Sequence, residues 1–268
     1  MRELLPEQIV FFRENGFLIL RGLLEPEDVN NMKEAVLRII DGFDDGIRSR
    51  SNVQRLKNRV TVQIQQLYQA NPLIAEFIKH PKLGEIASVL MNDTPEVRLW
   101  HDQVIYKPAK TGGPVAWHQD YFYWQHTDAP DMVTAWCALS EVTEENGCMY
   151  VVPGSHRFGM LENRYLADDH ELEYIFACLP EEAKNRSVKI PLILEPGDVT
   201  FHHPLLIHGS YNNDSDKDRL GYIMHFFPKH LRYLEKFDTL KQDNIKVPDG
   251  SLIRGENFPL VWSAHQTN

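Results

Sequence analysis

Val97-Arg-Leu-Trp-His-Asp-Gln-Val-Ile-Tyr-Lys107 is the stretch at which the hydrophobic period of the sequence changes to two residues. A period of two is typical of a β-strand. Further short segments of strand character follow, separated by proline and glycine turns, at 132–139, 149–152, 188–194, 199–203 and 220–227. Six or more short strands after a helical start predict a β-sandwich or jelly-roll barrel with helices packed on one side. Few windows could hold the crossover helix that a parallel sheet requires.

The first part of the chain predicts a helix, a strand and a second helix. From Pro6 to about Ile40 apolar residues recur at helical spacing, which indicates two amphipathic helices. Between them, the short apolar run Gly16-Phe-Leu-Ile-Leu-Arg-Gly22 is bounded by glycines. Such a run suits a buried strand.

Two different patterns separate this part from the strands. Residues 41–66 are polar and charged without a sustained apolar period, so we expect a loop or mobile flap there. Helical character returns over 71–91, where Pro72 and Pro81 are suitably placed to start two short helices.

Length and composition favour one domain. The chain has 268 residues, of which 43% are hydrophobic, enough to bury a substantial core. We expect a single domain over 1–268, with helical support over about 1–95, a barrel core over about 97–228 and a C-terminal extension over about 229–268. We find no internal repeat or low-complexity segment.

Charge and cysteine usage narrow the classes of partner. The formal net charge is 28 − 38 = −10 without a Lys/Arg run, which argues against a nucleic-acid partner. Three cysteines without a C-x-x-C pair suggest neither a disulfide framework nor a structural zinc site. Charged residues interrupt the N-terminal apolar residues, and the chain ends in His-Gln-Thr-Asn, so we expect no signal peptide, membrane span or peroxisomal address. A cytoplasmic protein is the expectation; its oligomeric state is not indicated.

The motif with the clearest chemistry is Trp117-His118-Gln119-Asp120. On an extended chain, residues two apart point to the same side, so His118 and Asp120 can share one metal ion. Fe(II) oxygenases use two histidines and one carboxylate, which predicts a third ligand from a distant histidine. A pair this short also occurs by chance, and His126-Thr127-Asp128 is a second example.

The distant ligand that we favour is His208. It lies in Ile207-His-Gly-Ser210, and Arg219 follows eleven residues later. His202 and His203 remain competing third ligands, although neither is followed by the Gly-Ser and arginine sequel.

Taken in order, these motifs resemble the phytanoyl-CoA dioxygenase family of Fe(II)/2-oxoglutarate oxygenases. The resemblance covers most of the chain and is most specific at Trp117-His-Gln-Asp-Tyr-Phe-Tyr-Trp124. The other matching segments are 8–24, Ala135-Trp-Cys-Ala-Leu139, 144–156, Gly197-Asp-Val-Thr-Phe201, His208-Gly-Ser210 and Arg219. Several ordered motifs with matching spacing are far more specific than any one of them.

The resemblance implies a mainly β protein with flanking helices, built on a double-stranded β-helix, the jelly-roll or cupin-like barrel. It implies Fe(II) held by His118, Asp120 and His208, with 2-oxoglutarate and O₂ as co-substrates. Arg219 would bind the far carboxylate of 2-oxoglutarate. A planar guanidinium forms two parallel charge-assisted hydrogen bonds to a carboxylate, a geometry that lysine cannot copy.

Four other residues are candidate 2-oxoglutarate contacts. Ser210 could add a hydroxyl to the same carboxylate, and Trp136 matches a family position that packs against the co-substrate. Gln103 and Lys107 share one face of a predicted strand, so both side chains can reach into the barrel. Trp136 is as readily an ordinary core residue.

The aromatic residues after Asp120 are candidates for the substrate pocket. Trp124 resembles a family position near the substrate, and Tyr121 and Tyr123 would line the mouth. All three are as easily core as pocket.

The leading hypothesis is a hydroxylase that acts on a small or medium organic metabolite and releases succinate and CO₂. Asp120 favours hydroxylation over halogenation, because related halogenases have a small residue at that position. Two alternatives stay open: a catalytically silent ligand-binding barrel protein, and a metalloenzyme of the same barrel fold that does not use 2-oxoglutarate. The substrate itself is not legible, because function transfers by site and the lid segments have no readable pattern.

Overall fold

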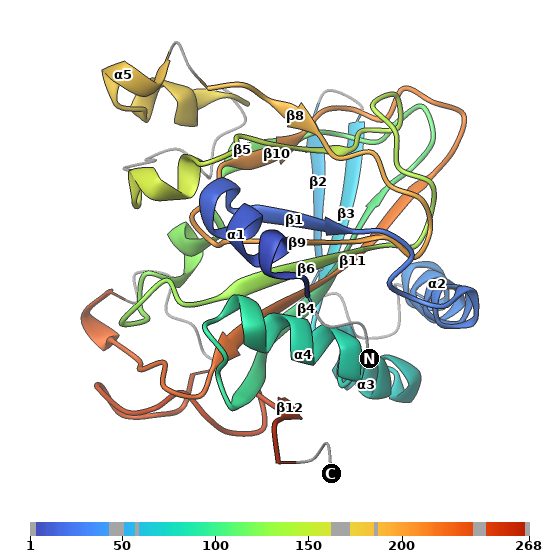
Figure 1. Ribbon diagram of the computed structural model, residues 1–268. Coiled ribbons are helices and arrows are strands. Elements are labelled where there is room, and N and C mark those ends of the chain that lie inside the picture. The colour runs from blue at the N-terminus through green and yellow to red at the C-terminus, as the bar shows by residue number, and fades with distance from the viewer. Residues whose placement is uncertain are drawn as a thin grey trace.

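Two antiparallel sheets form the body of the computed structural model, which describes residues 4–42, 51–56, 59–161, 172–184, 187–237 and 245–265 (Figure 1). The larger sheet has the order β1 (Phe17–Leu20), β9 (Val199–His202), β6 (Val133–Ala138), β11 (Arg219–Pro228), β4 (Glu96–Lys107), β3 (Arg59–Gln65) and β2 (Ser51–Leu56), and β12 (Leu260–Ser263) also pairs with β4. The smaller sheet has the order β5 (Val115–His118), β10 (His208–Ser210), β7 (Met149–Val151) and β8 (Ile190–Pro191). The prediction of a mainly β, double-stranded β-helix fold is confirmed. The two sheets remain separate and do not form one closed barrel.

The first four α-helices lie beside the larger sheet, and the last lies at the end of the smaller sheet (Figure 1). They are α1 (Pro6–Asn15), α2 (Pro26–Asp41), α3 (Pro72–Phe77), α4 (Pro81–Leu90) and α5 (Glu181–Lys184). Short 3₁₀ helices are η2 (Leu67–Gln69), η3 (Asp120–Trp124), η4 (Ser155–Phe158), η5 (Tyr174–Cys178) and η6 (Glu235–Phe237). The predicted order of helix, strand and helix is confirmed, and α1 to α4 each begin with a proline, whose fixed φ suits the first helical turn.

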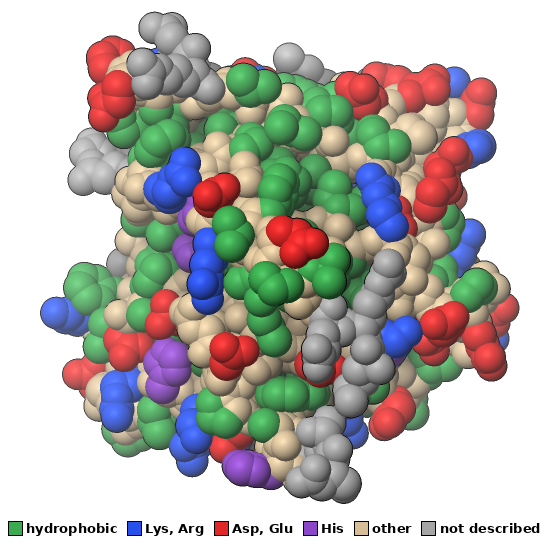
Figure 2. Space-filling view, in the orientation of Figure 1, with side chains coloured by type: hydrophobic (Ala, Val, Ile, Leu, Met, Phe, Trp, Pro, Cys, Tyr) green, Lys and Arg blue, Asp and Glu red, His purple; other side chains and the backbone are tan. Residues whose placement is uncertain are grey.

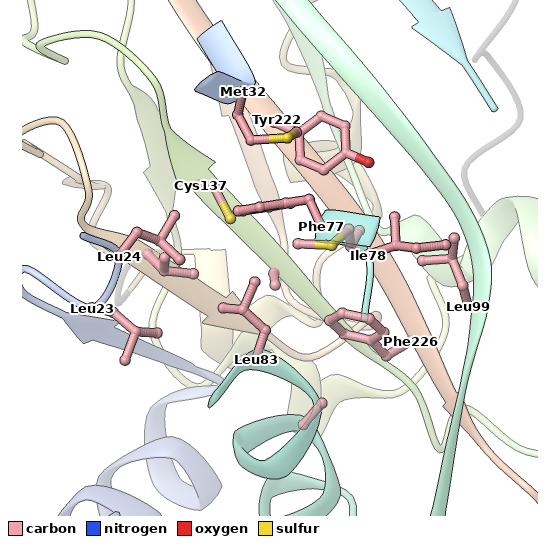
Figure 3. Packing of buried hydrophobic residues seen from close by; sticks show 14 of the residues in the cluster. Leu23, Leu24, Met32, Phe77, Ile78, Leu83, Leu99, Cys137, Tyr222 and Phe226 are labelled. Carbon is pink, nitrogen blue, oxygen red and sulfur yellow. The ribbon is translucent and has the colours of Figure 1, made fainter. Parts of the chain in front are cut away.

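Alternation along the strands gives the larger sheet two different faces. On one face, Val104, Cys137, Tyr222 and Phe226 are completely buried in the main hydrophobic cluster with residues of α2, α3 and α4. Figure 3 shows Tyr222 and Phe226 among the side chains of this cluster, with Leu83 projecting from α4. Burial of a side chain such as that of Val104 or Phe226 contributes about 1.5–3 kcal/mol. The opposite face is therefore free to carry the polar residues described below.

The predicted loop over 41–66 is wrong for half of its length. Residues 51–56 and 59–65 form the hairpin strands β2 and β3, and β3 pairs with β4; residues 43–50 and 57–58 lie outside the described part. The missed signal was the alternation of Val60, Val62 and Ile64 with polar residues. Ile64 is completely buried, so packing against β4 and the helices selects the strand.

The last third of the chain differs from expectation in two places. The predicted strand at 188–194 is reduced to the two residues of β8, at the edge of the smaller sheet. Pro191 has no backbone N–H to donate, and an edge strand tolerates this. The C-terminal extension adds β12 to the larger sheet. It also places Ile253 and Phe258 in a second hydrophobic cluster around Trp100 and Trp124.

Two further observations concern membrane and nucleic-acid partners. Within the described residues, no helix is both long enough and apolar enough to cross a membrane. On the face drawn in Figure 2, Lys and Arg side chains are interspersed with Asp and Glu. The expected absence of nucleic-acid and membrane partners stays a prediction.

Candidate functional site

The two predicted histidine ligands meet because β5 and β10 are neighbouring strands. His208 lies directly opposite His118 in this antiparallel pair, and the two ring centroids are 4.2 Å apart. Asp120 opens η3, two residues after His118. The three side chains form one group whose ligand atoms all lie within 4.8 Å of one another, hereafter the His-Asp-His cluster.

The cluster presents its free ligand atoms to one point. Oδ1 of Asp120 is 3.4 Å from Nε2 of His118 and 3.6 Å from Nε2 of His208. Neighbouring ligands of an octahedral ion at about 2.1 Å lie roughly 3.0 Å apart, so a small closure would accommodate a divalent ion. Nδ1 of His118 donates to the Ala116 carbonyl at 2.7 Å, and Nδ1 of His208 donates to the Leu206 carbonyl at 3.0 Å. These bonds select the tautomer that leaves both Nε2 lone pairs free for a metal.

The second carboxylate oxygen of Asp120, Oδ2, is held by hydrogen bonds. Oδ2 accepts hydrogen bonds from Oγ1 of Thr134 at 2.9 Å and from Nε2 of His202 at 3.2 Å. Burial raises the pKa of Asp120, but the neighbouring imidazoles of His208, His118 and His202 more than offset this effect, and the pKa lies well below its usual value. Asp120 is therefore an anion whose Oδ1 is directed at the two histidines.

The competing histidines lie elsewhere. His202 contacts Asp120 from the larger sheet but is outside the His-Asp-His cluster, and His203 packs against His156. His126 of the second His-x-Asp pair packs against Trp100 and Tyr233. Among the described residues, the His-Asp-His cluster is the one group of three or more His, Cys, Asp or Glu side chains with metal-binding geometry.

Two buried cations face each other on the larger sheet. Arg219 and Lys107 are directly paired across β11 and β4, and their exposed fractions are 2% and 0%. Burial, followed by the charge of Arg219, lowers the pKa of Lys107 well below its usual value, and burial lowers that of Arg219 to about 10. Neither cation has a carboxylate partner within ion-pair distance among the described residues. Such a pair is suited to binding an anion.

The contacts of this pair leave donor capacity unused. Nζ of Lys107 donates to Oγ of Ser210 at 2.6 Å and to the Tyr211 carbonyl at 2.5 Å. Arg219 donates to the Gly147 carbonyl through one terminal nitrogen at 3.2 Å, while its buried Nε has no partner. Ser210 lies two residues after His208 on β10, so this anion site adjoins the His-Asp-His cluster.

Trp136 forms the floor beneath Arg219. The guanidinium carbon is 5.0 Å from the ring centroid, a cation–π contact. Gly221 makes this possible, because a Cβ there would meet Cζ2 of Trp136 at 2.1 Å. The glycine is thus required for close approach of the ring.

Gln103 occupies the same face but is already engaged. Its Nε2 lies 3.1 Å from Nε2 of His225, and its Oε1 accepts from Gln63 at 2.5 Å. Sequence reasoning missed His225, Thr134 and Gln63. A signal was present for two of them: His225 shares strand parity with Arg219, and Thr134 shares it with Trp136.

The aromatic residues of η3 divide between core and surface. Trp124 is 3% exposed within the second hydrophobic cluster and contacts His225 at a centroid distance of 4.8 Å. Tyr121 packs against this cluster and donates its hydroxyl to the Thr127 carbonyl. Tyr123 is 36% exposed and lies edge-on to His118 at 6.3 Å.

A double-stranded β-helix with a two-histidine, one-carboxylate cluster beside a buried arginine defines the class of protein, an Fe(II)/2-oxoglutarate-dependent oxygenase. Residues 12–221, well over half of the chain, match the family model described as phytanoyl-CoA dioxygenase (PhyH). The chain therefore belongs to the phytanoyl-CoA dioxygenase family, and the predicted family, enzyme class and cofactors are confirmed.

Comparison with individual proteins agrees with this membership. Peroxisomal phytanoyl-CoA dioxygenase of Bos taurus is 27% identical over 260 residues, which cover 92% of this chain and 75% of that one. L-proline trans-4-hydroxylase of Streptomyces griseoviridis is 28% identical over 228 residues, covering 78% and 81%. The crystal structure of the epimerase SnoN with Fe³⁺, α-ketoglutarate and nogalamycin RO has a TM-score of 0.77 at 22% identity, covering 96% and 98%. At that identity the likeness is one of fold.

Proposed function

We propose that this protein hydroxylates a small or medium-sized organic metabolite, with Fe(II) held by His118, Asp120 and His208. The observation that carries the proposal is the His-Asp-His cluster beside the buried cation pair of Lys107 and Arg219. When bound, iron and 2-oxoglutarate supply the oxidising chemistry: one C–H bond becomes C–OH, O₂ is consumed, and 2-oxoglutarate yields succinate and CO₂. Everything else is binding and positioning by the protein.

The donor set fits Fe(II). Two imidazoles and one carboxylate are the ligands that Fe(II) oxygenases use, and His118, His208 and Asp120 would supply them while leaving room for co-substrate and O₂. The backbone bonds of His118 and His208 hold both rings in the required tautomer. The aspartate at position 120 supports hydroxylation, because its carboxylate would fill the position that a halide would need.

The buried cations fit the far carboxylate of 2-oxoglutarate. We assign that carboxylate to Arg219, with Ser210 and Lys107 as further donors and Trp136 as the wall of the pocket. Nε of Arg219 is a buried donor without a partner, and a carboxylate would satisfy it while compensating the charge. Gln103 keeps one amide hydrogen for the co-substrate at most, because its other polar groups are engaged.

The substrate pocket is proposed at the side of the cluster where Tyr123 is exposed, with Trp124 and Tyr121 behind it. The name of the Streptomyces relative supports hydroxylation of a small molecule, and the names of the other relatives point to acyl thioesters.

We further propose that the whole chain is one domain and that it acts in the cytoplasm. Support for a single domain comes from β12, whose residues near the end of the chain pair with the central strand β4. The proposal of a cytoplasmic location rests on the sequence alone, whereas several relatives are named as peroxisomal enzymes.

The test is an anaerobic titration of apo protein with Fe(II) and then 2-oxoglutarate, followed by the weak visible charge-transfer band of the chelate. We expect the band in the wild type, and a dissociation constant for 2-oxoglutarate at least about tenfold higher in Arg219→Ala. Arg38→Ala is the matched control, because that side chain is 79% exposed on α2. Absence of the band at saturating Fe(II) and 2-oxoglutarate would contradict the proposal and favour another metal or a non-catalytic binder.

A further inference from the structure

A chain of hydrogen bonds runs from Asp120 across the larger sheet to the hairpin strand β3. Oγ1 of Thr134 is 2.9 Å from Oδ2 of Asp120, and Nδ1 of His225 is 2.8 Å from Oγ1 of Thr134. Nε2 of His225 is 3.1 Å from Nε2 of Gln103, whose Oε1 is 2.5 Å from Nε2 of Gln63. The four residues after Asp120 lie on β6, β11, β4 and β3, which are consecutive in the sheet.

Strand register explains why these side chains meet. His225 lies directly opposite Thr134 across β11 and β6. Gln103 is opposite Ile223, two residues from His225, so Gln103 and His225 are diagonal neighbours. Gln63 is likewise diagonal to Gln103, because Gln65 is its direct partner. Opposite and diagonal neighbours on one face are within reach of each other.

Donor and acceptor chemistry gives this chain a single direction. An ionised carboxylate only accepts, so the Thr134 hydroxyl donates to Asp120 and its oxygen accepts from Nδ1–H of His225. Nε2 of His225 is then an acceptor and receives the amide N–H of Gln103. The Gln103 oxygen accepts in turn from the Gln63 amide. All four bonds point toward Asp120, an arrangement in which each bond polarises the next.

We infer that Thr134, His225 and Gln63 are positioning residues for the iron-binding carboxylate. They hold Oδ2 of Asp120 so that Oδ1 faces His118 and His208, and Gln63 acts through the three side chains between. The inference rests on the proposed role of Asp120 as an iron ligand. It goes beyond that role by making metal affinity depend on a side chain of the β2–β3 hairpin, four hydrogen bonds from the carboxylate.

The test uses Co(II) alone, titrated into apo protein without 2-oxoglutarate and followed by its visible d–d absorption. We expect Thr134→Val, which removes the hydroxyl at constant shape, to raise the Co(II) dissociation constant about 10- to 100-fold, as loss of a partner behind a metal ligand does. Gln63→Leu should raise it about threefold. Gln65→Leu is the matched control on the same strand and face, where the side chain is exposed, and should leave it unchanged.

A positioning role predicts three further results that a general loss of stability does not predict. Gln63→Leu should have no additional effect in a Thr134→Val background, because the chain is already broken. Thr134→Ser keeps the hydroxyl and should restore both the affinity and the wild-type d–d spectrum. His225→Leu should behave as Thr134→Val does, with a smaller effect.

Two contrary results have separate meanings. The positioning role alone would be overturned if the wild type binds Co(II) tightly and Gln63→Leu binds it as Gln65→Leu does. The same conclusion would follow if Gln63→Leu has equal effects in the wild-type and Thr134→Val backgrounds. Failure of the folded wild type to bind Co(II), or binding that survives His118→Ala, would overturn the proposed metal site and the positioning role together. Thermal unfolding of each apo variant shows that the comparison is between folded proteins.

Discussion

Lys107 and Arg219 illustrate how much of the site depends on single residues. Like charges directly opposite each other across two strands are destabilising, and both side chains are almost fully buried. The ionised pair is therefore unfavourable in the apo protein, and a bound anion would offset that cost. A buried cation pair without a carboxylate is a stronger indication of an anionic co-substrate than either residue alone.

The first prediction concerns the lysine of this pair. Lys107→Met should raise the dissociation constant of 2-oxoglutarate about tenfold, because one charge-assisted hydrogen bond is lost. The anaerobic charge-transfer titration measures it. Lys110→Met, whose side chain is 59% exposed three residues further on, should bind as the wild type does. Equal affinities for both variants would remove Lys107 from the co-substrate site.

A second prediction at the scale of single residues concerns Gly221. Gly221→Ala places a Cβ against Trp136, so the ring must move and its contact with Arg219 is lost. We expect a loss of about 1–3 kcal/mol in the free energy of unfolding, measured in urea, together with weaker 2-oxoglutarate binding. The double variant Gly221→Ala, Trp136→Phe has a smaller ring and should recover part of the stability. No recovery would show that the clash lies elsewhere.

At the scale of elements, β4 is amphipathic in an unusual way, because its core face includes a carboxyl group. Asp102 is fully buried and accepts hydrogen bonds at Oδ2 from the Tyr222 hydroxyl at 2.7 Å and from the Tyr68 backbone N–H at 3.0 Å. Burial raises its pKa to about 6, against the effect of the Tyr222 bond. The folded protein therefore holds this proton over a range in which the unfolded chain has released it.

The pH dependence of stability follows from that pKa. Because the folded pKa is above the unfolded value of 3.8, the contribution of Asp102 to stability is greatest below about pH 4 and is lost as the pH rises through about 6. Asp102→Asn removes this titration. The difference in unfolding free energy between wild type and variant, measured in apo protein, should fall from pH 4 to 6 and be constant above about pH 7. A difference independent of pH would contradict the raised pKa.

At the scale of the whole molecule, the proposed cofactor site lies between the two sheets. His118 and His208 belong to the smaller sheet, while Lys107, Trp136 and Arg219 belong to the larger one. Ligands that contact both sheets stabilise the folded state relative to the unfolded chain by mass action.

Thermal unfolding tests both the stabilisation by bound ligands and the proposal of a single domain. At 100 times the dissociation constant, Mn(II) with 2-oxoglutarate under anaerobic conditions should add about 2.7 kcal/mol, a rise in Tm of roughly 5–10 °C. One cooperative transition should move as a whole, and His118→Ala should show no shift. Two transitions, of which one responds, would contradict the single domain.

Local patterns determined much of this protein. The two-residue spacing of His118 and Asp120, the prolines that begin the helices, and the alternation of the main strands are readable because each depends on residues close in sequence. The order of motifs then indicated His208 and Arg219. The short alternation in β3 was equally local but was obscured by the polar residues around it.

Only the tertiary structure decided what lies behind and beside the proposed metal ligands. Lys107 meets Arg219 because of the register of β4 and β11, and Thr134 meets His225 across 91 residues of sequence. Gln103 and His225 are 122 residues apart. A shift of one residue in register would turn each of these side chains to the opposite face. Register is set by packing of the whole core, so no local pattern in the sequence records these contacts.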